Sequence, residues 1–353
     1  MENQHIFVQN FEKLMKEKIN PVMLTLARES RQMFQQELSE RLEVSKTYMC
    51  FLEQEPNTVN PDLLKQLSKV LNYPKSFFFQ EGEIVPPNLS YRKRDKVSIK
   101  DINSIEAFIN IYRNNIQRLY SLLDFPVLKL PKISENPNEA ATQIRHKWKL
   151  PKGVIENMTT ILEENNITVI NFDFGTERVD ARSVFTNKKH PIIFINSRMT
   201  GDRQRFTLAY ELGHLLLHLN GQDTFNKDVS HEANLFAAEL LMPENDIIPD
   251  FEEMINLNVL AKLKKKWKVS MISLFHRAED LGALTPNQSH YLLKQFNQQG
   301  IRRREPLELD IPHEQNTLLK SVISQYKQKK RLTYKELAED FHLTENEFSK
   351  MYN

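Results

Sequence analysis

Cysteine is almost missing from this chain, which has one, Cys50, among 353 residues. A single thiol excludes an intramolecular disulfide and every cysteine-rich zinc site. Charge of one sign is not in excess either, because the formal net charge is only +2, so nucleic-acid binding would require a local basic face. No apolar run approaches the roughly 20 residues that cross a bilayer, and the N-terminus lacks the apolar core of a signal peptide. These absences predict a cytoplasmic protein that does not enter the membrane.

The residues that are present predict an α+β fold dominated by helices. The composition, 40% hydrophobic and 27% charged, is that of a folded protein, and the length allows two or three domains. Short helical patterns occupy residues 21–80, and an amphipathic helix over 101–124 ends before Pro126. The strand patterns are few, and they predict one small sheet from residues 167–174, 183–186 and 191–196.

The segment "FTLAYELGHLLLH", residues 206–218, differs in one residue from the H-E-x-x-H pattern of zinc peptidases. In that pattern two histidines one helical turn apart hold Zn²⁺, and the glutamate between them acts as general base. Here Tyr210 takes the first position, followed by Glu211 and His214. A catalytic zinc normally has three protein ligands, and Glu232 in "HEANLFAAELLMP" is the candidate for the third. The alternative is a leucine-rich core helix without a metal.

The leucines of this segment define its expected orientation. They recur at helical spacing and predict a helix that is buried on one side and polar on the other. The residues of this apolar face are Leu208, Leu212, Leu215 and Leu219.

"DRQRFTLAYELGHLLLH" followed by "EANLFAAELLMP" resembles the ImmA/IrrE family of metallopeptidases, over roughly residues 135–300. The resemblance implies a zincin-like domain in which Glu211 is the base, His214 and Glu232 bind zinc, and the substrate is a partner regulator. Tyr210 stands where the family has its first histidine. A phenol, with a reference pKa near 10, must lose a proton before it binds a metal, so we expect zinc to be bound weakly or not at all. We interpret His218 and His231 as incidental.

Residues 20–82 have the helical rhythm of a helix-turn-helix, in "LARESRQMFQQELSERLEVSKTYMCFLEQ". Ser45 is placed to cap the third helix, whose N-terminal part enters the major groove in this motif. The residues expected to face DNA are Gln35, Lys46, Thr47 and Phe51. The block resembles the XRE (lambda-repressor-like) family, although Glu43 occupies the turn where glycine is usual and Phe34 the usual cap position. A helical bundle that only mediates dimerisation is the alternative.

The C-terminal residues 301–353 are expected to form a separate helical domain, after 83–134 as linker and amphipathic helix. "KELAEDFHLTENEFSKMY" repeats the rhythm of "QELSERLEVSKTYMCFLE" at a constant offset. Glu345 and Asn346 replace Lys46 and Thr47 at the reading positions, and a carboxylate there would repel phosphate. We therefore expect this helix-turn-helix-like block to pack on the peptidase-like domain or on a partner.

Three functions are compatible with these patterns. The first, which we favour, is a bacterial or phage transcriptional regulator that binds an operator, in its own promoter, as a homodimer. Its peptidase-like domain would sense a signal or cleave the chain itself. The second is an active zinc endopeptidase that cleaves a partner regulator. The third is a non-enzymatic adaptor or immunity component.

Overall fold

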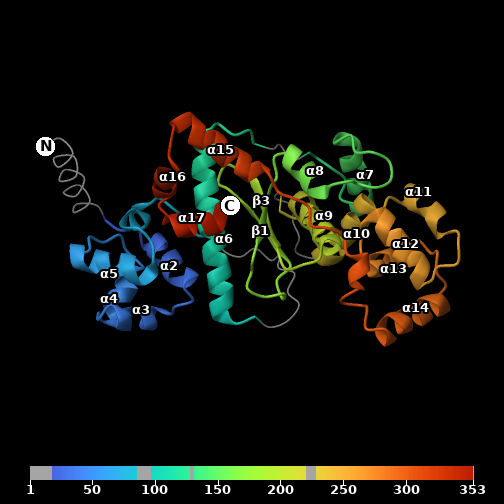
Figure 1. Cartoon of the computed structure of the whole chain (residues 1–353), viewed down its shortest axis with the longest axis horizontal. Helices are drawn as coiled ribbons and strands as arrows, with labels where there is room; N and C mark the ends of the chain where they lie inside the picture. Colours follow the sequence, from blue (N-terminus) through green and yellow to red (C-terminus); the bar gives the residue numbers. More distant parts are fainter. Residues whose placement is uncertain (1–17, 86–96, 128–130, 220–227, 353) are drawn as a thin grey trace. The chain divides into compact units, whose positions relative to one another are not determined.

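The computed structural model describes residues 18–85, 97–127, 131–219 and 228–352 (Figure 1). The chain divides into two compact units. Of the described residues, the first unit contains 18–85, 97–125 and 319–352, and the second contains 126–127, 131–219 and 228–318. The basic segment "VPPNLSYRKRDK", interpreted as a linker, lies outside the described residues apart from Val85, and so does the N-terminal segment 1–17.

The first unit is helical. Its N-terminal helices are α2 (Pro21–Ser30), α3 (Gln35–Arg41), α4 (Lys46–Leu52) and α5 (Pro61–Leu71), followed by the 3-10 helix η1 (Lys75–Phe79) and by α6 (Ile99–Leu122). Its C-terminal helices are α15 (Leu318–Lys330), α16 (Tyr334–Asp340) and α17 (Glu345–Tyr352). Helix α6 confirms the amphipathic helix that the sequence predicts before Pro126.

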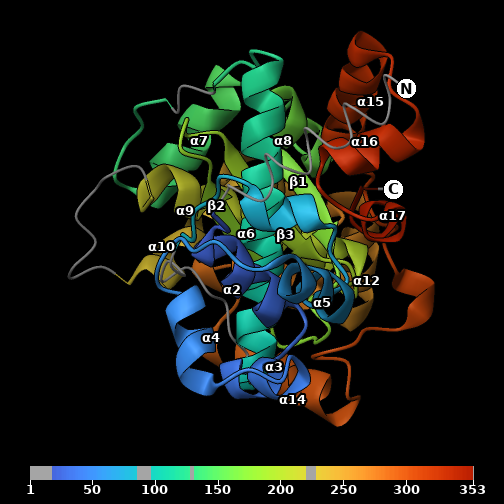
Figure 2. The same cartoon turned by 90° about the vertical axis from the view of Figure 1, so that its left-hand side faces the viewer.

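Helices α3 and α4, in the segment that the sequence predicts as a helix-turn-helix, are joined by a short turn and lie side by side in both views (Figure 2). The Ser45 hydroxyl caps α4 as expected, accepting a hydrogen bond from the Tyr48 amide at 3.1 Å. Glu43 has a φ of 56°, so the turn needs the left-handed conformation that glycine adopts at least cost. At the start of α3 the Phe34 side chain has no atom that could accept a hydrogen bond and cap the helix. Instead, the Phe34 amide donates to the Glu37 carboxylate at 2.6 Å.

The C-terminal helices repeat this arrangement in three dimensions. Helices α3 and α16 both have seven residues, and a short turn separates each of them from the next helix. The turn residue of the second copy, His342, has a φ of 53°, close to the 56° of its counterpart Glu43. The Thr333 amide donates to Glu336 at 2.8 Å, as the Phe34 amide does to Glu37. The repeat seen in the sequence is therefore a repeat of structure.

The second copy packs within the first unit. The Glu347 carboxylate, which is buried, lies 3.3 Å from the Arg31 guanidinium and 3.4 Å from the Asn72 amide. The Tyr112 hydroxyl of α6 donates to the Met351 carbonyl at 2.6 Å. We expected this block to rest on the peptidase-like domain or on a partner. Among the described residues, its contacts are instead with residues at the ends of α2 and α5 and on α6, all in the first unit.

The second unit contains a three-stranded sheet. Its strands are β1 (Thr168–Phe172), β2 (Ala181–Phe185) and β3 (Pro191–Asn196), in the order β1-β3-β2. Strand β1 runs parallel to β3, and β2 runs antiparallel to it with Ser183 opposite Ile193. All three predicted strands are confirmed. Around them lie α7 (Pro137–Lys147), α8 (Met158–Glu164), α9 (Gly201–Leu217), α10 (Val229–Leu241), α11 (Glu244–Ile247), η2 (Ile248–Phe251), α12 (Leu257–Trp267), α13 (Met271–Asp280), α14 (Pro286–Gln298) and η3 (Leu307–Leu309).

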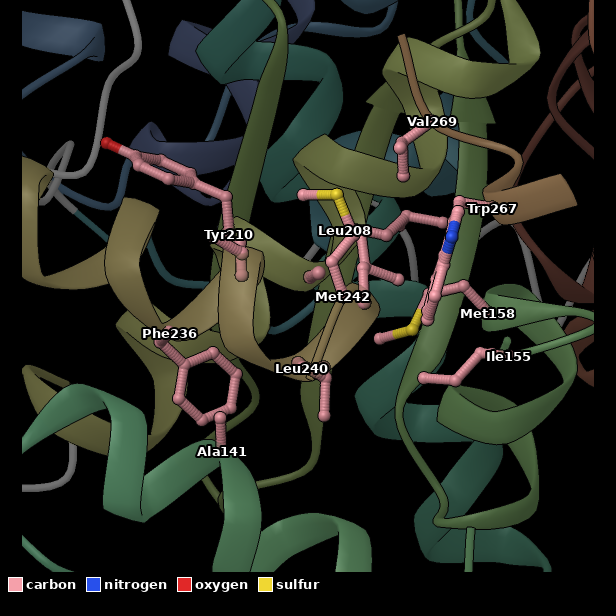
Figure 3. Packing of buried hydrophobic residues seen from close by; sticks show 14 of the residues in the cluster. Ala141, Ile155, Met158, Leu208, Tyr210, Phe236, Leu240, Met242, Trp267 and Val269 are labelled. Carbon is pink, nitrogen blue, oxygen red and sulfur yellow. The ribbon is translucent and has the colours of Figure 1, made fainter. Parts of the chain in front are cut away.

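Helix α9 is the centre of this unit's core (Figure 3). It packs on β2 and β3 and on α10, and every residue from Thr207 to Leu217 is buried. The expectation of one polar, open face is therefore wrong, because the sheet and α10 cover different sides of the helix. Gly213 permits this close packing, since a Cβ at that position would lie 3.1 Å from the ring of Phe236 on α10. Of the helices described here, none combines the length and the apolar character needed to cross a membrane.

Candidate functional site

Two adjacent helices supply the residues of the peptidase-like motif. Tyr210, Glu211 and His214 lie on α9, and Glu232 lies in the first turn of α10. Asp228 caps α10 by accepting from the His231 amide at 3.0 Å, which sets where that helix begins. Residues four apart on a helix share a face, so one turn of α9 separates Tyr210 from His214 on the side of α10.

Glu211 is fully buried and bound to the sheet. Its Oε2 accepts a hydrogen bond of 2.5 Å from the Ser183 hydroxyl, at the middle of β2. Ser183 was not predicted as a site residue. Its strand was predicted, but nothing in the alternation of that strand indicates which position faces a particular helix.

His218 is a buried histidine that connects the two helices. Its Nδ1 lies 2.9 Å from Nδ1 of His214, and its Nε2 lies 2.9 Å from Oε2 of Glu232. The three side chains form a chain of hydrogen bonds from α9 to α10. The spacing of four residues between His214 and His218 was the signal that pointed to this pairing.

Tyr210 is oriented by a serine of α10. Its hydroxyl lies 3.3 Å from the Ser230 hydroxyl and is the donor. Its ring, which is only 3% exposed, meets the His214 ring edge-to-face with centroids 4.6 Å apart. Figure 3 shows the hydroxyl directed away from the labelled apolar side chains. The phenol therefore serves both as part of the core and as a contact between α9 and α10.

Tyr210 is the residue that does not fit the three-ligand zinc site of an H-E-x-x-H peptidase, because a neutral phenol is a poor zinc ligand. His214 and His218 are also not placed as two ligands of one zinc. Nitrogens bound to one tetrahedral zinc lie about 3.3 Å apart, because each is about 2.0–2.1 Å from the metal. The 2.9 Å between the two Nδ1 atoms is instead a hydrogen-bond distance, and the Glu232 carboxylate is bound to the other side of the His218 ring. Across the described residues, no group of three or more His, Cys, Asp or Glu side chains is arranged to hold a metal ion.

The residues predicted to face DNA divide into two groups. Lys46, Thr47 and Phe51 are exposed on α4. Gln35 is held against the protein, because its amide donates to Glu53 Oε2 at 2.8 Å. Glu53 in turn is paired with Arg28, whose Nε lies 2.6 Å from Oε1. Of the residues expected to face DNA, those on α4 are therefore exposed, and Gln35 is not available.

Comparison with known proteins identifies the domain that carries the site. Residues 162–279 match the Peptidase_M78 family model, described as an IrrE N-terminal-like domain. The chain is also 36% identical over 107 residues to the radiation response metalloprotease IrrE of Deinococcus radiodurans. That match covers 25% of this chain and 30% of the relative. The family-model match lies within the second unit and includes α9 and α10.

Proposed function

Because residues 162–279 match an IrrE N-terminal-like domain, we propose that this protein is a cytoplasmic, DNA-binding transcriptional regulator in which that domain no longer works as a peptidase. The domain would serve as a sensing module, with zinc bound weakly or not at all. DNA would be bound by the helix-turn-helix of the first unit.

The observation that carries the proposal is the exposed surface of α4. The helix is held by Leu52 and Met49, which are fully buried, and by the Ser45 cap, while Lys46, Thr47 and Phe51 remain accessible. In helix-turn-helix proteins this is the helix that enters the major groove. A hydroxyl and an ammonium at its first turn are groups that contact base edges and phosphates.

The arrangement at α9 disfavours an active zinc endopeptidase, the second function compatible with the sequence. The Tyr210 hydroxyl is directed to Ser230, and His218 binds the carboxylate of Glu232. The side chains at two of the three expected ligand positions thus have protein partners. A metal would have to break these contacts before it could bind all three positions.

DNA binding is tested with the DNA upstream of the protein's own coding sequence, in a mobility-shift assay over a salt series. Lys46→Ala combined with Thr47→Ala should weaken binding at least tenfold, because each good base contact contributes about 1–3 kcal/mol. Lys65→Ala, at an exposed position of α5, is the matched control and should bind as the wild type does. Equal affinity of the double variant and the wild type, or an affinity independent of salt, would contradict the proposal.

The regulator is expected to act as a homodimer on a pseudo-palindrome, since a two-fold protein matches two half-sites about one helical turn of DNA apart. Sedimentation of the free protein and of its complex with a single-operator duplex measures the stoichiometry. Two chains per duplex is the expected result, and one chain per duplex would contradict it.

A further inference from the structure

The reading helix α4 exposes large aromatic side chains. Phe51 is 47% exposed and Tyr48 is 36% exposed, and both lie on this seven-residue helix. Phe34, 46% exposed, precedes α3 next to it. Single exposed apolar residues are common on protein surfaces, but three large exposed rings on and near one short helix favour contact with another molecule.

The same helix lacks the side chains that most often read purines. Its sequence, "KTYMCFL", contains no arginine, asparagine or glutamine, which make the bidentate contacts with guanine and adenine. Gln35, the nearest predicted alternative, is held by Glu53. The exposed groups able to reach bases are thus an ammonium, a hydroxyl with a methyl group, and two aromatic rings.

Charge leads to the same conclusion. Residues 18–85 contain eight Lys and Arg but nine Asp and Glu, so this block does not attract phosphates strongly as a whole. Helix α4 itself carries Lys46 and no carboxylate. The surface of this helix is therefore better suited to binding a polyanion than the block as a whole. Because this block has no excess of cations to contact phosphates, contacts with bases must supply a large part of the affinity for DNA.

From these features we propose that α4 recognises the 5-methyl group of thymine, with Phe51 as the specificity-determining residue. Thymine is the one DNA base with a methyl group in the major groove, and Phe and Thr side chains are its apolar partners. Thr47 lies one helical turn before Phe51, so its methyl group and the ring face the same side of α4. Lys46, next to Thr47, places a positive charge towards the backbone. This inference rests on the proposed DNA-binding function and specifies its ligand.

The test compares two versions of the upstream DNA, one synthesised with thymidine and the other with deoxyuridine, which lacks only the methyl group. We expect the full chain to bind the thymidine DNA more tightly, by about fourfold for each methyl group that contacts α4. Phe51→Ala should remove most of this preference while binding the deoxyuridine DNA nearly as the wild type does. Thermal unfolding checks that the variant is folded, as its exposed position predicts. The control is Ile99→Ala, which removes another exposed apolar side chain and should leave the preference unchanged.

Each outcome decides a specific point. If both DNA versions bind equally well, methyl recognition is wrong while DNA binding stands. A preference that persists in Phe51→Ala would show that this residue does not determine it. No binding to either version would overturn the proposed function itself.

Discussion

At the residue scale, Tyr210 is where the motif of this chain departs from H-E-x-x-H. Tyr210→His should raise zinc affinity at least 10–100-fold, the range that changes around a metal's ligands produce. An imidazole binds zinc in its neutral form, whereas a phenol must first lose its proton. Competition titration of both proteins with a zinc chelator measures the difference. Equal, stoichiometric zinc in the two proteins would show that the tyrosine is a competent ligand.

A second residue-scale prediction concerns His342, in the turn between α16 and α17. Burial, together with the nearby Arg118 guanidinium, lowers its pKa to about 4, although Asp340 acts in the opposite direction. In the unfolded chain the pKa of a histidine is near 6.5. Between about pH 6.5 and pH 4, the unfolded chain therefore binds a proton at this residue and the folded chain does not. The stability of the first unit should fall as pH decreases from about 6.5 towards 4.

His342→Asn isolates this effect, because asparagine accepts the positive φ of the turn. Urea unfolding at pH 7 and pH 5 gives the loss of stability for each protein. The variant should lose less than the wild type over this interval. Equal losses in the two proteins would exclude His342 as the group responsible.

At the element scale, a buried lysine ties α12 to the N-terminal turn of α9 and to the segment after α14. Lys264 Nζ lies 2.7 Å from Asp202 and 2.6 Å from Glu305. Glu305 also accepts from the Met271 amide at the start of α13, at 2.8 Å. Because all three charged side chains are almost fully buried, the ammonium is needed to balance two carboxylates.

Lys264→Met should therefore lower the free energy of unfolding by about 3–5 kcal/mol, the cost of leaving a buried charge without its partner. Lys265→Met, one residue away and exposed, should change it by less than about 0.5 kcal/mol. Chemical denaturation of the full chain measures both values. A loss below about 1 kcal/mol in Lys264→Met would mean that the two carboxylates are neutral or hydrated in the folded protein.

At the scale of the whole molecule, the proposal predicts a regulator that does not cleave itself. The protein incubated with equimolar zinc should remain intact, because Tyr210 replaces the first histidine of the motif and His218 binds the Glu232 carboxylate. Electrophoresis and mass spectrometry follow the chain over time. Glu211→Gln is the matched control, since it removes the motif's base and should leave the result unchanged. Zinc-dependent cleavage of the wild type that is absent in Glu211→Gln would establish peptidase activity instead.

The amino-acid sequence alone determined the elements and the motif. The strands at Thr168–Phe172, Ala181–Phe185 and Pro191–Asn196 follow from short β-branched and aromatic runs, and α6 follows from its helical periodicity. The Ser45 cap and the repeated pattern of two short helices are also local, because a few tens of residues are enough to specify each of them. The spacing of Tyr210, Glu211 and His214 placed them on one helix for the same reason.

Only the tertiary structure decided which side chains meet. The bonds of Glu211 to Ser183 and of His218 to Glu232 join residues on different elements, and no period along one element specifies such a pair. The sequence predicted that helix α9 is buried on one side only, but the sheet and α10 bury its polar positions as well as its leucines. Gln35 was expected to face DNA, but its amide donates to Glu53 instead, and the Glu347 carboxylate is paired with Arg31. The free energy of burying a polar group depends on the partner it finds, and that partner is set by how the elements pack.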